Sequence, residues 1–115
     1  MRAMGAFGGG LAGNGEVCGA VVGALAVIGL ITSRGNEQEK EDPRMWTLSD
    51  DFLERFKTEI SGGKIRCYDI AGVDWSDPNQ VHAYYVRGNE QQLRCRKLVG
   101  NTAMVVGEML ENGPK

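Results

Sequence analysis

The run from Val17 to Ile31 constrains the fold most, because it contains no charged residue and consists largely of Ala, Val, Leu, Ile and Gly. It falls short of the ~20 apolar residues that a membrane-spanning helix needs, and three glycines interrupt it. We therefore predict no membrane span. We predict a buried core helix from Glu16 to about Arg34, with Gly35 as its stop.

Further helices are predicted along the rest of the chain. A capping box beginning at Thr47 is expected to open an amphipathic helix, whose apolar residues recur at helical spacing: Phe52, Leu53, Phe56 and Ile60. Asn89 is predicted to cap a final helix that runs to about Glu111. Residues 67–73 are predicted as a short helix or a strand, and residues 80–86 have an ambiguous pattern that allows a short helix.

These segments define the expected fold class. We predict an all-α protein, a small helical bundle of about four helices joined by glycine-rich and charged loops. The charged loop is expected between Asn36 and Asp42, and a glycine run at residues 8–10 should end a first helical segment. With 115 residues, the chain is predicted to form one domain over residues 1–115.

Charge and targeting signals restrict partners and compartment. The formal net charge is −2, so no basic surface indicates a nucleic-acid partner. Glycine-rich sequence follows Arg2 where a signal peptide would have a continuous apolar segment, and we therefore expect a reducing, cytoplasmic setting. Cysteines in that setting are more often catalytic, metal-binding or simply buried than bridged by structural disulfides.

The three cysteines are the best candidates for chemistry. Cys18 is predicted in the first turn of the apolar helix, where unpaired backbone N–H groups stabilise a thiolate and lower its pKa, although Glu16 opposes this. Cys67 and Cys95 each have adjacent cationic residues, which favour a thiolate if those charges point inward. Gly19 and Gly23 leave one helix face without side chains, so that a bound group or another backbone can approach closely.

Two other interpretations remain open at this point. Each cysteine can be a small buried hydrophobe, and Cys95 fits this well because it shares a predicted apolar helical stripe with Val99, Thr102, Val106 and Met109. Alternatively, the cysteines hold a metal ion or an iron–sulfur cluster. A zinc set of three cysteines and His82 is arithmetically available, but no Cys-x-x-Cys pair supports it, and His82 is expected at the surface or an interface.

A family resemblance is carried by two strings near the N-terminus. Residues 7–10 read FGGG and residues 15–24 read GEVCGAVVGA. Together with the helix that follows Phe52, they resemble the redox-active protein family named for its C_GCAxxG_C_C cysteine pattern. Cys67 and Cys95 lie where the last two cysteines of that pattern are expected. The most specific part is the CGAxxG string that runs from Cys18 to Gly23.

The resemblance implies redox or ligand roles for Cys18, Cys67 and Cys95. Gly19, Ala20 and Gly23 are implied as the motif that frames Cys18 and any group bound beside it. The family's first cysteine is expected in a helix upstream of Met1, so we expect this chain to lack it. The missing helix should leave apolar surface exposed and favour homo-oligomerisation.

The sequence thus predicts thiol–disulfide exchange, as in a thiol-dependent oxidoreductase, with Cys18 as the reactive thiol and Cys67 or Cys95 resolving it. A metal or iron–sulfur module and a helical interaction domain with inert cysteines are the alternatives. The redox partner is not specified by the sequence.

Overall fold

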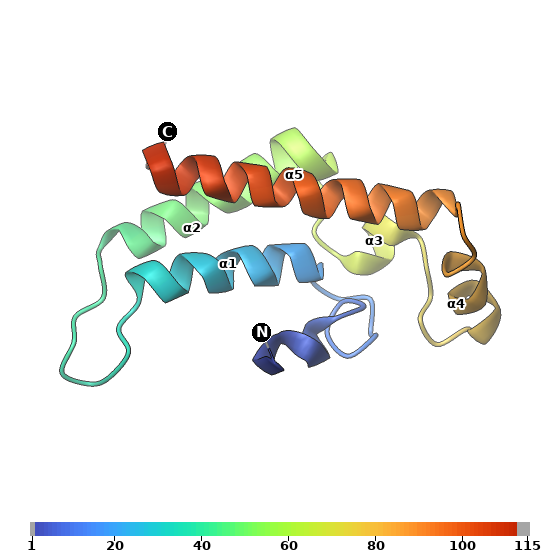
Figure 1. The fold of residues 1–115 in the computed structure, drawn as a ribbon, viewed down its shortest axis with the longest axis horizontal. Coiled ribbons are helices and arrows are strands. Elements are labelled where there is room, and N and C mark those ends of the chain that lie inside the picture. The colour runs from blue at the N-terminus through green and yellow to red at the C-terminus, as the bar shows by residue number, and fades with distance from the viewer. Residues whose placement is uncertain (1, 113–115) are drawn as a thin grey trace.

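The computed structural model describes residues 2–112, which form an all-α fold, as predicted. Its elements in chain order are a 3₁₀ helix (η1, Arg2–Phe7), α1 (Gly19–Thr32), α2 (Arg44–Arg55), a π-helical continuation of α2 (η2, Phe56–Ser61), α3 (Cys67–Ala71), α4 (Pro78–Tyr84) and α5 (Glu90–Asn112). Figure 1 shows α1 and α2 lying alongside the long α5, with α3 and α4 gathered near the first turns of α5. Among these described residues, no helix is long and apolar enough to cross a membrane.

The core lies between α1, α2 and α5, where side chains recur at the helical spacing that buries one face of each helix. Its members are Val21, Ala24 and Ile28 of α1, Leu48 and Phe52 of α2, Phe56 of η2, and Leu98, Val105, Val106 and Met109 of α5. The predicted amphipathic helix is confirmed, since Phe52 and Phe56 are fully buried with ring centroids 6.0 Å apart. These contacts fix the mutual positions of the three longest helices.

The apolar run does form a helix, but its burial is one-sided. Val21 and Ile28 are each 1% exposed, whereas Leu30 is 86% and Ile31 59% exposed. The helix also begins at Gly19 rather than Glu16, because the residues before it are extended and hydrogen-bonded to residues 65–67. Cys18 therefore precedes the first turn instead of lying within it.

The start of α2 corrects a second prediction. The helix begins at Arg44, directly after Pro43, so Thr47 lies inside it rather than at its N-cap. Asp42 marks the end of the loop and stabilises the start of α2. Its carboxylate accepts hydrogen bonds from the Arg44 backbone N–H at 2.9 Å and from the Arg44 guanidinium at 2.7 Å. These hydrogen bonds lower the pKa of the Asp42 carboxyl.

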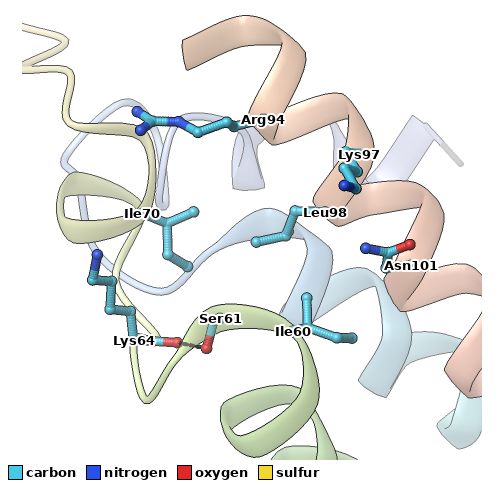
Figure 2. A pocket seen from close by; sticks show the side chains of 8 residues that line it. All are labelled: Ile60, Ser61, Lys64, Ile70, Arg94, Lys97, Leu98 and Asn101. Carbon is cyan, nitrogen blue, oxygen red and sulfur yellow. Dashed lines mark hydrogen bonds between the residues drawn. The ribbon is translucent and has the colours of Figure 1, made fainter. Parts of the chain in front are cut away.

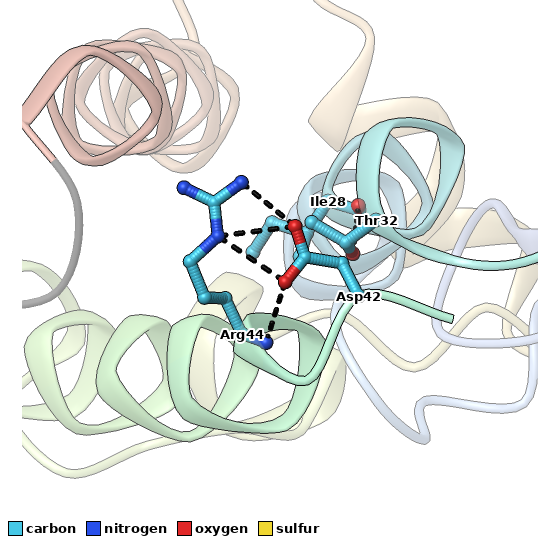
Figure 3. A network of polar contacts seen from close by, with 4 residues as sticks. All are labelled: Ile28, Thr32, Asp42 and Arg44. Atoms are coloured by element: carbon cyan, nitrogen blue, oxygen red, sulfur yellow. Dashed lines mark hydrogen bonds and ion pairs between the residues drawn. The ribbon is translucent and has the colours of Figure 1, made fainter. Parts of the chain in front are cut away.

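The charged loop between α1 and α2 ends beside α1, and Figure 3 shows Asp42 next to Thr32 and hydrogen-bonded to Arg44. The Thr32 hydroxyl donates to the carbonyl of Ile28 at 2.6 Å, and the Thr32 carbonyl accepts the Asp42 N–H at 2.7 Å. Because Thr32 is buried, these bonds satisfy polar groups that would otherwise be costly there. The loop thus closes on itself and returns the chain antiparallel to α1.

In the second half of the chain, the observed structure agrees closely with the structure predicted from the sequence. The Asn89 side chain accepts from the Gln92 N–H at 2.9 Å, which confirms the predicted cap of α5. The segment left open between helix and strand contains α3 (Cys67–Ala71), and the segment at residues 80–86 is helical as far as Tyr84. On α5, Thr102, Val106 and Met109 are buried as predicted, but Val99 is 55% exposed. The predicted apolar stripe is therefore buried in the second half of α5 but exposed at Val99.

Candidate functional site

The three cysteines come from three different elements. Cys18 lies directly before α1, Cys67 is the first residue of α3, and Cys95 lies near the start of α5. All three are free thiols and all are partly buried. These elements meet at the end of the bundle that carries α3, so residues distant in sequence contribute to one region (Figure 1).

A short stretch of antiparallel pairing holds Cys18 beside Cys67. Val17 and Arg66 form an isolated β-bridge, the Cys18 N–H donates to the Ile65 carbonyl at 2.8 Å, and the Cys67 N–H donates to the Glu16 carbonyl at 2.6 Å. Because side chains alternate between the two faces of such a pair, Cys18 and Cys67 share the face opposite Val17 and Arg66. The two cysteines are diagonal neighbours, whose Cα atoms lie about 7–8 Å apart in a regular pair of strands.

The other two thiols contribute to the electrostatic environment of Cys18. Burial raises the pKa of Cys18, and thiolate charge at Cys67 and at Cys95 would raise it further, with Cys67 the stronger of the two. Hydrogen bonds from the Ala20 and Val21 N–H groups lower the pKa but do not prevail over burial. The predicted lowering of the Cys18 pKa is therefore wrong, because the thiol lies against the core.

An aromatic cluster of Trp75, Tyr84 and Tyr85 lies beside the other two thiols. The Trp75 indole N–H donates to the Cys67 sulfur at 3.4 Å. Burial, followed by a hydrogen bond with Cys95, raises the pKa of the Tyr84 hydroxyl. The rings of Trp75 and Tyr84 meet edge to face with centroids 5.1 Å apart, as do those of Tyr84 and Tyr85.

This cluster is the part of the site that sequence reasoning missed. None of its three residues is among the site residues predicted above. The available signal was local, because Trp75, Tyr84 and Tyr85 all lie in the segment that connects Cys67 to Cys95. Within this connection Asp77 caps α4, because its carboxylate accepts a hydrogen bond from the Asn79 N–H.

The glycine-rich turn of residues 8–15 packs against Cys67. Gly10 has φ +72°, and a Cβ there would lie 2.6 Å from the Cys67 Cβ and 2.6 Å from the Glu16 nitrogen. Only glycine fits this close approach in a left-handed conformation. The glycines of this turn thus position the backbone that pairs with α3.

The predicted frame residues Gly19, Ala20 and Gly23 line a different feature. They form one wall of an apolar groove of about 520 Å³ between α1 and α5, whose other wall includes Val99, Ala103 and Gly107. The groove begins directly after Cys18. A cofactor at these residues stays a prediction, as does the homo-oligomer that exposed apolar surface would favour.

The metal alternative gains no geometric support. Within residues 2–112, no group of three or more His, Cys, Asp or Glu side chains is placed to hold a metal ion. His82 lies exposed on α4, as expected for a surface residue. The three thiols are neighbours, but they are not arranged as a ligand set.

Fold and site together define a class: small all-α proteins with several free thiols gathered at one end of a helical bundle. Residues 1–109 match the family model described as "Putative redox-active protein (C_GCAxxG_C_C)". The chain belongs to this family, which confirms the resemblance carried by the string around Cys18. No match is found among curated proteins or among solved structures.

Proposed function

We propose that this protein exchanges dithiol for disulfide between Cys18 and Cys67, with a disulfide-bearing partner as oxidant. The observation that carries the proposal is the backbone pairing of residues 16–18 with residues 65–67, which holds the two thiols on one face. A disulfide needs Cα atoms about 4.4–6.8 Å apart, so a modest closing of the diagonal pair is sufficient. The family's description as redox-active agrees with this chemistry.

Cys67 is the better attacking group in this arrangement. Burial keeps Cys18 protonated to higher pH than an ordinary thiol, whereas the Cys67 sulfur has the Trp75 N–H as a partner for negative charge. The order expected from the sequence, with Cys18 attacking first, is therefore reversed in our proposal. Cys18 then serves as the resolving thiol.

The exchange transfers two electrons in two thiol–disulfide steps. The Cys67 thiolate attacks one sulfur of the partner's disulfide, forms a mixed disulfide and releases the other sulfur as a thiolate. Cys18 loses its proton to solvent and attacks the Cys67 sulfur, which releases the partner's second thiolate. Two electrons pass to the partner, which takes up two protons as two thiols, and the protein retains a Cys18–Cys67 disulfide.

Cys95 is the third thiol and stands outside the pair. It is hydrogen-bonded with Tyr84, and its charge affects Cys18 less than that of Cys67 does. This predicts that Cys95 is dispensable for forming the disulfide, although it lies close enough to alter the pair's reactivity.

Thiol counting in redox buffers tests the proposal. The full chain is equilibrated with mixtures of reduced and oxidised dithiothreitol, alkylated and weighed by mass spectrometry. We expect reversible loss of two thiols in the unchanged protein and in Cys95→Ser, and no such loss in Cys18→Ser or Cys67→Ser. Retention of all three thiols under oxidising conditions, or loss of the exchange in Cys95→Ser alone, would contradict it.

A further inference from the structure

A hollow between η2, α3 and α5 combines a basic rim with an apolar floor. Figure 2 shows Lys64, Arg94 and Lys97 around a centre occupied by the side chains of Ile70 and Leu98. The hollow has a volume of about 380 Å³ and is completed by Ile60, Ser61 and Asn101. Its α5 residues lie at positions 94, 97, 98 and 101, the spacing of one helix face.

The three cations have no carboxylate to neutralise them. No Asp or Glu lines the hollow, and none of these cations forms an ion pair within the described residues 2–112. Elsewhere in the same fold, Arg44 and Arg55 each pair with a carboxylate at 2.6–2.7 Å. A protein with a formal net charge of −2 thus concentrates unpaired positive charge at a concave site.

We propose that this hollow binds a small organic anion that carries at least two negative charges on an apolar body, as a phosphate monoester or a dicarboxylate. The apolar body would rest on Ile60, Ile70 and Leu98, which face the hollow from three elements. The anionic groups would meet Lys64 on one side and the α5 cations on the other. Arg94 offers the planar donor pair that suits both phosphate and carboxylate oxygens.

The site is distinct from the paired thiols, although the two share elements. Leu98 separates the face of α5 that lines the hollow from the face that carries Cys95 and Val99. Ile70 belongs to α3, whose first residue is Cys67. Binding is therefore proposed independently of the exchange reaction, and it is measured without reference to the thiols.

Calorimetry on the reduced full chain tests the proposal, with phenyl phosphate, phthalate and inorganic phosphate as probes. We expect phenyl phosphate or phthalate to bind, at least about fivefold more tightly than inorganic phosphate, because only they cover the apolar floor. Tighter binding of phenyl phosphate would identify the ligand class as phosphate monoesters, and tighter binding of phthalate would identify it as dicarboxylates. No binding of either, or inorganic phosphate binding equally well, would overturn the proposal.

Variants on α5 provide a matched control. Arg94→Gln and Lys97→Gln should each lower the affinity for the tighter-binding organic probe about tenfold, because each variant loses a charged hydrogen bond to the anion. Arg96→Gln removes the same charge from a neighbouring position that does not line the hollow, and it should change the affinity by less than about twofold. All three residues are exposed, so the helical content measured by circular dichroism should be unchanged. Equal weakening by Arg96→Gln and Arg94→Gln would show diffuse charge attraction and overturn the assignment.

Discussion

The two ends of the molecule are built differently. Around Phe52 and Phe56, the bundle is held by apolar side chains that are fully buried between three long helices. Around Cys67, the chain is held by backbone hydrogen bonds, a left-handed glycine turn and an aromatic cluster, and the thiols stay partly exposed. A closely packed bundle thus supports a region whose thiols stay partly exposed, and this division suits the exchange that we propose.

The largest effect is expected in the bundle. Phe52→Ala should lower the free energy of unfolding by about 3–5 kcal/mol, because it leaves a cavity where the ring is 0% exposed. Chemical denaturation followed by circular dichroism measures it. Met104→Ala on the outer face of α5, where the side chain is 73% exposed, is the control and should cost less than about 0.5 kcal/mol. Similar losses in both variants would refute a core centred on Phe52.

The glycine turn should be the next most sensitive position. Gly10→Ala should cost about 1–3 kcal/mol from its left-handed φ, and the added Cβ should also push Cys67 away from Glu16. Gly8→Ala, whose Cβ would meet nothing closer than 3.7 Å, is the matched control and should be nearly neutral. Denaturation gives the stability, and disulfide yield in oxidising buffer reports the site. An unchanged yield in Gly10→Ala would argue against pairing of the two segments as the basis of exchange.

Alkaline pH should weaken the fold through Cys18. Burial raises the pKa of this thiol above its ordinary value of 9.0, so the folded chain keeps a proton that the unfolded chain releases. The stabilising contribution is complete below pH 9 and is lost as pH rises from there through the higher pKa of the folded state. Unfolding free energies of reduced protein across this range should fall less steeply in Cys18→Ala. Parallel curves for the two proteins would contradict a buried, protonated Cys18.

The smallest effect is expected at the aromatic cluster. Trp75→Phe keeps an aromatic ring but removes the N–H that donates to the Cys67 sulfur. Alkylation of Cys67 near neutral pH should slow by roughly twofold to tenfold, as for the loss of one hydrogen bond. Trp46→Phe changes an exposed ring on α2 and should leave the rate unchanged. A faster reaction in Trp75→Phe would mean that the indole merely shields the thiol.

Periodicity predicted the bundle well, because the spacing of Phe52 and Phe56 and the cap at Asn89 report local structure. It misplaced the starts of α1 and α2, where tertiary pairing and Asp42 override the local signals. The sequence singled out the three cysteines, but it did not predict that the pKa of Cys18 is raised. The pKa of Cys18 depends on what is packed around it, and the indole partner of Cys67 comes from a turn whose path no local pattern describes.

The central claim is that Cys18 and Cys67 form the exchanging pair. Peptide mapping of the oxidised full chain, digested without reduction and read by mass spectrometry, tests it most directly. We predict one linked peptide that joins Cys18 to Cys67, with Cys95 recovered as a free thiol. A linked peptide that contains Cys95, or recovery of all three cysteines as free thiols, would contradict the claim.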